Sequence, residues 1–191
     1  MKIIECQQSL SAGLSATRFS VAGGSVLAAV AGKIHGMAEA YESDGLTFCA
    51  SGDLVNGMAS FWYAFGWLHF GISYGIFADP GPGSCPSPGF NERLPGESRE
   101  ALDEKTRRYQ HLLRTARLSV TCSPERETVS GEFSDRILFI TGIFELQGSR
   151  YLSAGRTEDA LACFSYGHGW LDAGVTSGLF RIQQERDLFT V

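Results

Sequence analysis

The residues best suited to chemistry lie close together near the C-terminus, where His168 and Asp172 are four positions apart. On a helix this spacing brings two side chains onto one face, so the pair could bind a metal ion or act as an acid and a base. Tyr166 lies two positions before the histidine, and its hydroxyl could contact a ligand. A histidine at the edge of a core and a tyrosine bonded to a neighbouring helix are commoner, so we predict no catalytic residue and no metal site.

The stretch that holds these residues occurs twice in the chain. Residues 52–77 and residues 155–180 align without a gap at an offset of 103 positions, and ten of the 26 aligned residues are identical. The identical pairs are Gly52/Gly155, Ala59/Ala162, Phe61/Phe164, Tyr63/Tyr166, Gly66/Gly169, Trp67/Trp170, Leu68/Leu171, Gly71/Gly174, Gly75/Gly178 and Phe77/Phe180. We interpret the repeat as an internal duplication that organises the whole chain.

The first copy does not reproduce the histidine and the aspartate. It has Phe65 and His69 at those two positions, so we expect any site built on such a pair to exist only once. The tyrosine and the tryptophan are present in both copies. The candidate ligand-binding residues are therefore Tyr63, Trp67, His69, Tyr166, His168, Trp170 and Asp172.

Many of the identical residues recur at every fourth position, which is the spacing of one ridge along an α-helix. The ridge of the first copy consists of Ala59, Tyr63, Trp67, Gly71 and Gly75. Glycine inside a helix costs about 1 kcal/mol relative to alanine, so glycines repeated in both ridges indicate close packing against a neighbouring helix. We expect close packing there rather than a ligand groove, with the tryptophans of both ridges largely buried.

The patterns around the ridge predict three helices in each half of the chain. In the first half they span residues 6–21, 26–51 and 54–77, and in the second half residues 97–120, 134–154 and 158–180. The first helices match in a register that differs by four residues from the later match, and we expect a longer loop at residues 121–131 to absorb this shift. The last residues, 181–191, are expected to extend the final helix, and no strand is predicted.

We therefore predict an all-α fold in which two tandem three-helix repeats pack as one pseudo-two-fold six-helix body. The domains are residues 1–78 and residues 97–191, joined over the surface by a linker at residues 79–96 that contains five of the six prolines. The third helix of the first copy is apolar nearly all round, so its ridge, with Gly71 and Gly75, is expected near the two-fold axis. The corresponding helix of the second copy is more charged and is expected to face solvent on its far side.

A membrane span is the main alternative for the third helix, because residues 54–78 run for 25 positions without a charged side chain. The second copy argues against it, since Glu158, Asp159 and Asp172 lie in the matching segment. A buried helix fits both copies, whereas a membrane span fits only one. We predict that the protein does not enter a membrane.

Composition excludes several classes of function. The 191 residues have a net charge of −5 and no basic block to oppose it, which argues against nucleic acid as the partner. A nuclease of the helical toxin type would need an arginine shortly before a histidine on an exposed face, and only Arg107 or Arg108 with His111 offers this. The sequence contains no nucleophile elbow, phosphate loop or dinucleotide fingerprint, so no cofactor is predicted.

The cysteines and the N-terminus bear on the compartment. The five cysteines are Cys6, Cys49, Cys85, Cys122 and Cys163. Their number is odd and no C-x-x-C spacing occurs, so we interpret them as reduced thiols. The N-terminal residues lack the apolar region of a signal peptide. Both observations predict a cytoplasmic protein.

A family resemblance rests on the second ridge, where the run Gly169-Trp-Leu-Asp-Ala-Gly174 ends a helix that contains Tyr166. This run resembles the archaeal helical proteins of domain of unknown function family 357. The resemblance covers the last two helices of each half, residues 38–77 and 141–180. The first copy has a histidine in place of the aspartate, so any role of that aspartate transfers to Asp172 alone. The resemblance implies an archaeal, intracellular protein and supplies no established activity.

Two hypotheses about function remain. The first is a non-catalytic binding or scaffold module for a protein partner or a small apolar ligand. The second is an enzyme or metal-binding protein that uses Tyr166, His168 and Asp172. The lack of a duplicated polar constellation favours the first hypothesis. The sequence leaves a homo-oligomer open and does not identify the partner, the ligand or the biological process.

Overall fold

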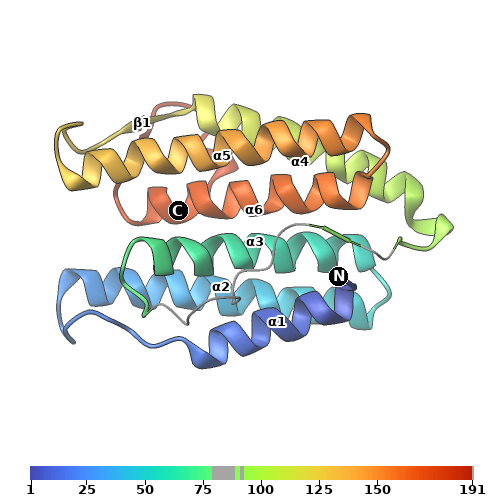
Figure 1. Cartoon of the computed structure of the whole chain (residues 1–191), viewed down its shortest axis with the longest axis horizontal. Coiled ribbons are helices and arrows are strands. Elements are labelled where there is room, and N and C mark those ends of the chain that lie inside the picture. Colours follow the sequence, from blue (N-terminus) through green and yellow to red (C-terminus); the bar gives the residue numbers. More distant parts are fainter. Residues whose placement is uncertain (79–88, 91–92, 191) are drawn as a thin grey trace.

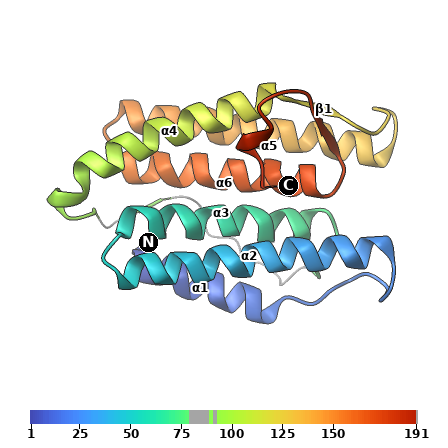
Figure 2. The same ribbon diagram turned by 180° about the vertical axis from the view of Figure 1, so that it is seen from behind.

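The computed structural model describes residues 1–78, 89–90 and 93–190. Its six long helices are α1 (Ile3–Ala16), α2 (Val26–Ala50), α3 (Leu54–Ser73), α4 (Arg99–Leu118), α5 (Val129–Ser153) and α6 (Thr157–Thr176). Helices α3 and α6 lie side by side in the middle, with α1 and α2 on one side and α4 and α5 on the other (Figures 1 and 2). This arrangement confirms the predicted all-α body of two three-helix repeats. Within the described ranges, no helix is both long enough and apolar enough to cross a membrane.

The turn between the second and third helices is built in the same way in both repeats. Helix α2 stops where Gly52 adopts a left-handed conformation with φ of 85°, and α5 stops at Gly155 with φ of 71°. Glycine adopts this conformation without the steric penalty of a side chain. Asp53 then caps α3, because its carboxylate accepts a hydrogen bond from the backbone nitrogen of Asn56 at 3.0 Å. The two helices that this turn joins run antiparallel in each repeat (Figure 1).

The two repeats meet where α3 and α6 pass each other at Gly66 and Gly169, which are equivalent positions of the duplication. A Cβ atom on Gly66 would lie 2.5 Å from the backbone oxygen of Tyr166, and one on Gly169 would collide with the backbone oxygen of Tyr63. The reciprocal contact is what a pseudo-two-fold axis between α3 and α6 produces. Only glycine allows the two backbones to approach this closely.

The prediction that Gly71 and Gly75 lie near this axis is wrong. Gly75 ends α3 with φ of 79°, and no atom lies within 4 Å of the place where its Cβ would be. Gly71 instead provides space for the ring of Phe77, which folds back against α3. Gly66, Gly71 and Gly75 therefore have three different roles, and sequence spacing alone does not distinguish them.

The prediction that residues 181–191 extend the last helix is wrong, because a glycine equivalent to Gly75 ends that helix as well. Gly178 reverses the chain after α6, and a short strand follows, β2 (Phe180–Ile182), which pairs antiparallel with β1 (Val120–Cys122). The first repeat has a single bridge between Phe19 and Phe77 at the matching place. The prediction that the chain has no strand is therefore wrong, because β1 and β2 form this small sheet. Two short 3-10 turns, Gly96–Ser98 and Arg186–Leu188, complete the described elements.

The predicted four-residue register shift between the first helices is also wrong. The backbone nitrogen of Ser20 donates to the oxygen of Ile76, and that of Ser123 donates to the oxygen of Leu179, both at 2.9 Å. These contacts are related by the same offset of 103 positions as the later helices. The local similarity around Leu113 therefore does not reflect structural equivalence, and the loop in the second repeat absorbs no shift.

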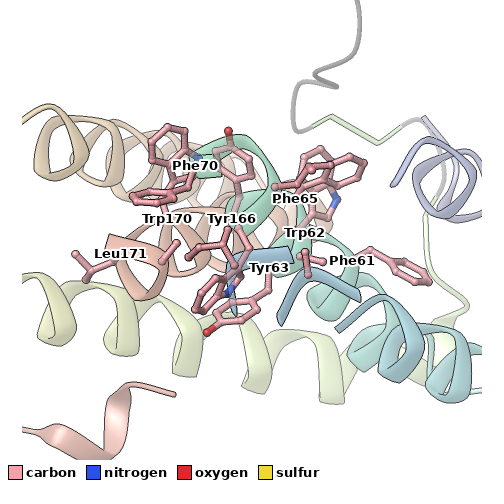
Figure 3. Close-up of a cluster of buried hydrophobic side chains, with 14 of the residues drawn as sticks. Phe61, Trp62, Tyr63, Phe65, Phe70, Tyr166, Trp170 and Leu171 are labelled. Carbon is pink, nitrogen blue, oxygen red and sulfur yellow. The ribbon is translucent and has the colours of Figure 1, made fainter. Parts of the chain in front are cut away.

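The core consists of aromatic side chains that α3 and α6 contribute together (Figure 3). Trp67 is 0% exposed and Trp170 is 3% exposed, so the predicted burial of both tryptophans is confirmed. The ring of Trp170 packs edge-on against Phe70 of the other repeat, with ring centroids 5.9 Å apart. The two repeats thus share one core.

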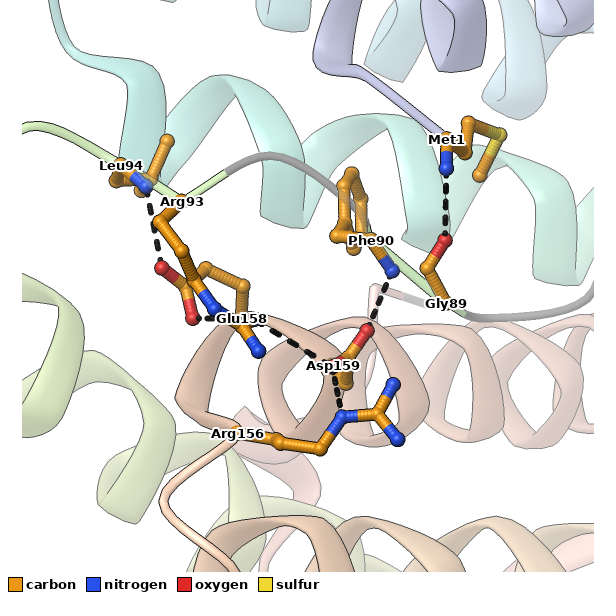
Figure 4. Close-up of polar contacts among 8 residues, drawn as sticks. All are labelled: Met1, Gly89, Phe90, Arg93, Leu94, Arg156, Glu158 and Asp159. Atoms are coloured by element: carbon orange, nitrogen blue, oxygen red, sulfur yellow. Dashed lines mark hydrogen bonds and ion pairs between the residues drawn. The ribbon is translucent and has the colours of Figure 1, made fainter.

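Helix α6 does not face solvent on its far side, because every residue from Thr157 to Val175 is buried. The two acidic residues of its first turn, Glu158 and Asp159, bond to the end of the linker and to Arg156 (Figure 4). Asp159 accepts hydrogen bonds from the backbone nitrogen of Phe90 at 2.6 Å and from Arg156 at 2.7 Å. Glu158 pairs with Arg93 at 3.1 Å. Charge on α6 therefore indicated a covering segment rather than a solvent-exposed face. Residues 79–88 and 91–92 of the predicted linker lie outside the described residues.

Candidate functional site

A buried polar cluster joins the two repeats beside the glycine crossing. The hydroxyl of Tyr63 on α3 donates a hydrogen bond to Oδ2 of Asp172 on α6. The hydroxyl of Thr190 donates to the same oxygen at 3.2 Å, and Nε2 of His168 lies 3.7 Å from it. That nitrogen also lies 2.9 Å from the backbone oxygen of Leu188, and because a carbonyl oxygen only accepts, Nε2 must carry a hydrogen. The structure therefore brings three candidate residues together.

The second oxygen of Asp172 is the exception in this cluster. Asp172 is 0% exposed, and within the part of the chain that the structure describes Oδ1 has no hydrogen-bond partner. Burial raises the pKa of Asp172 above its ordinary value, although His168 and the two hydroxyl groups act in the opposite direction. Burial, followed by the negative charge of Asp172, raises the pKa of Tyr63 well above its ordinary value. A buried acceptor without a donor is costly, and such atoms mark places where a ligand can supply the missing hydrogen bond.

A cavity of about 190 Å³ lies over this cluster. Its lining comes from α2, α3, α4, α6 and the C-terminal segment, which runs back along α6 (Figure 2). The lining residues are Tyr41, Ala59, Ser60, Tyr63, Tyr109, Leu112, His168, Asp172, Asp187, Leu188 and Thr190. Asp187 and Thr190 are exposed, so the cavity opens to solvent beside the C-terminal segment. Both repeats contribute to it, so neither half alone could form the site.

The duplication produces a second contact of the same kind on the other side of the axis. Tyr166 is equivalent to Tyr63, and its hydroxyl lies 3.0 Å from Nδ1 of His69, which is equivalent to Asp172. The expectation that the first copy offers no matching polar arrangement is therefore corrected. In both cases the tyrosine of one repeat contacts a polar residue of the other repeat, and that polar residue lies six positions after the other repeat's own tyrosine. The pair His168 and Asp172 itself occurs once, as the sequence indicates.

Burial lowers the pKa of His69 to about 4 from an ordinary value of 6.5. Between these two pKa values the unfolded chain binds a proton at His69 that the folded protein does not. The free energy of unfolding is therefore unaffected by His69 above the unfolded pKa and falls as the pH drops below it. From about pH 7.5 to about pH 5, we expect this group to lower the free energy of unfolding by about 2 kcal/mol. Urea unfolding at the two pH values measures the change.

The matched control for this prediction is His69→Gln, which retains polar atoms but does not titrate. Asp172 acts in the opposite direction, because its raised pKa stabilises the folded protein more as the pH falls. Asp172 is present in both the variant and the unmodified protein, so the difference in their loss of unfolding free energy between the two pH values reports His69 alone. Equal loss of stability in the variant and in the unmodified protein would contradict the prediction.

The remaining candidates are not in the cavity lining. Trp67 and Trp170 lie in the shared core, where the hydroxyl of Tyr166 also lies 3.0 Å from Nδ1 of His69. Sequence reasoning missed Tyr41, Tyr109 and Thr190, which do line the cavity. One signal was available for Tyr41, because the equivalent position of the second repeat is Phe144 and only one of the two has a hydroxyl.

The described residues do not include a group of three or more histidine, cysteine, aspartate or glutamate side chains placed to hold a metal ion. Arg107, Arg108 and His111, considered for nuclease chemistry, are all exposed on α4. A larger groove of about 730 Å³ lies between α2 and the C-terminal segment and shares Thr190 with the cavity. Of its lining residues, Lys33, Arg181 and Arg186 are basic.

The fold and the site define a class of duplicated all-helical protein in which both repeats line a small cavity. The family model described as "Protein of unknown function (DUF357)" matches residues 7–77 and again residues 108–180. The two matches cover more than half of the chain, so the protein belongs to this family and contains its domain twice. No curated protein and no solved structure matches the chain. The archaeal origin implied by the resemblance stays a prediction.

Proposed function

We propose that the protein is a non-catalytic binding module of the cytoplasm that holds a small, largely apolar ligand in the cavity between its repeats. One observation carries the proposal: the cavity lies over the buried carboxylate of Asp172, one oxygen of which has no donor among the described residues. Ligand sites in proteins combine an apolar lining with a few fixed polar groups in this way. The free thiols of the four described cysteines agree with a reducing compartment.

A cavity-filling variant tests this proposal. Leu112 lines the cavity from α4, and Leu112→Trp should fill it and abolish the rise in melting temperature that a panel of small ligands causes. Leu118 on the same helix is 73% exposed, so Leu118→Trp is the matched control and should respond to ligands as the unmodified protein does. A ligand that stabilises both variants equally binds elsewhere, and the proposed site is then wrong.

An apolar stripe on α5 supports a second candidate, the protein partner. Its members are Phe139, Ile143 and Leu146, which are 68%, 45% and 55% exposed. They are spaced i, i+4 and i+7, so they share one helix face. The matching positions on α2 are Gly36, Ala40 and Ser43. We propose that the partner is a second copy of the chain, because a two-fold axis would place the same apolar stripe of two copies face to face and bury both.

Sedimentation equilibrium tests the second candidate. The unmodified protein should form dimers at high concentration, and Leu146→Glu should remain a monomer because a charge cannot be buried unpaired between the stripes. The control is Ser43→Glu, the equivalent change on the exposed face of α2, which should leave the dimers intact. Monomers at every concentration of the unmodified protein would contradict self-association.

A further inference from the structure

We infer that the cavity beside Asp172 takes a small organic cation of the alkylammonium class, with its nitrogen at the carboxylate and its carbon chain against the tyrosine rings. This inference rests on the proposed function, because it assigns a ligand class to the same cavity. The observations that support it are the hydrogen bonding of the carboxylate, the aromatic lining, the size of the cavity and the distribution of charge around it.

The carboxylate of Asp172 lacks one hydrogen-bond donor. Oδ2 accepts from Tyr63 and from Thr190, whereas Oδ1 is buried with no partner among the described residues. An ammonium group offers several N–H donors together with a positive charge, so it would satisfy Oδ1 and offset the cost of burying the carboxylate. A neutral hydroxyl ligand would supply the hydrogen bond without the charge, and an anion would add repulsion.

The aromatic lining favours the same ligand class. Tyr41, Tyr63 and Tyr109 all line the cavity, and the rings of the first two lie 4.4 Å apart between centroids. The faces of such rings attract cations, and they also pack well against an alkyl chain. Tyr109 already shows this preference, because the ammonium of Lys105 lies 5.0 Å over its ring. That lysine lies outside the cavity lining and bonds to Asn56.

The charge of the surroundings and the size of the cavity limit the ligand further. Asp172 and Asp187 are both acidic, none of the lining residues is a lysine or an arginine, and His168 is the one lining residue that a proton would make positive. The basic residues gather in the larger groove beyond Thr190, so the two hollows have opposite character. A volume of about 190 Å³ corresponds to roughly six molecules of liquid water. It therefore accommodates an ammonium head with a short chain.

Three probes of similar length test the inference: n-butylammonium, n-butanol and n-butyrate. Their affinities are measured by NMR titration of the full chain at constant ionic strength. We expect n-butylammonium to bind at least about tenfold more tightly than n-butanol, the factor that one hydrogen bond to a charged group supplies. Equal binding of the alcohol would overturn the cation inference and leave the small-ligand proposal standing. Binding of none of the three would overturn both.

Variants locate the binding site. Asp172→Asn keeps the shape of the side chain, and it should reduce the affinity for n-butylammonium at least about tenfold while the affinity for n-butanol changes little. Glu127→Gln removes the same charge from an exposed loop position and should change neither affinity. If Asp172→Asn does not fold, Tyr41→Leu replaces it, because loss of the ring should weaken the cation more than the alcohol. Unchanged binding of n-butylammonium in a folded Asp172→Asn or Tyr41→Leu variant would overturn the assignment.

Discussion

Replacing Gly66 by leucine is expected to lower the free energy of unfolding by about 3 kcal/mol, the upper end of the cost of overpacking. A side chain at this position meets the backbone of α6, since even a Cβ atom would lie 2.5 Å from the backbone oxygen of Tyr166. Backbone atoms cannot move aside as a flexible side chain can, so α3 and α6 must separate. Urea unfolding followed by circular dichroism measures the loss.

The control for this variant is Gly36→Leu. Gly36 is also a glycine inside a helix, but no atom lies within 4 Å of the place where its Cβ would be. Leucine is a better helix former than glycine, so this change should raise the free energy of unfolding by up to about 1 kcal/mol. If the two variants have the same stability, the close approach of α3 and α6 at Gly66 is not a feature of the folded protein.

Replacing Trp67 by alanine is expected to cost about 3–5 kcal/mol, the range for removing a large aromatic side chain from a core. The side chain is completely buried, and its ring lies 6.2 Å from that of Tyr63, which belongs to the polar cluster. The cavity left behind adjoins the contact between the repeats, so both repeats should lose stability together. A single cooperative urea transition at lower concentration is the expected result.

Phe139→Ala is the matched comparison at protein concentrations where the chain is monomeric, because this aromatic side chain on α5 is 68% exposed in the single chain. Its removal should change the free energy of unfolding by less than about 0.5 kcal/mol, as is usual for surface positions. A Trp67→Ala variant as stable as Phe139→Ala would contradict the shared core. Two separate transitions would show that the repeats unfold independently.

The duplication determined much of the fold from the sequence alone. The gapless match between residues 52–77 and residues 155–180 predicts the third helices of both repeats, because helical periodicity is a local property of the sequence. Gly52 and Gly155 set the turns before them, since a left-handed residue is a local requirement. The pair His168 and Asp172 could be recognised as a candidate site for the same reason, because two residues four positions apart on a helix lie on the same face.

Other features depend on contacts between segments far apart in the chain. Gly66 and Gly71 are both glycines repeated in the second copy, yet Gly66 contacts the backbone of α6 whereas Gly71 accommodates a ring from its own repeat. Acidic residues on α6 suggested solvent, but Asp159 is buried because Phe90 and Arg156 satisfy it. Periodicity describes one helix at a time, so it cannot indicate which partner covers a face.

The candidate site shows the same division. The sequence identified His168 and Asp172 as a pair on one helix and Tyr63 on the ridge of another, and their types and helical positions are local information. That Tyr63 donates to Asp172, 109 residues away, follows only from the packing of α3 on α6 about the pseudo-two-fold axis. The cavity likewise needs Tyr41 and Thr190, which lie on elements outside both ridges. The sequence therefore determined the helices and their chemistry, and the tertiary structure decided which side chains meet, because that depends on the relative placement of the two repeats.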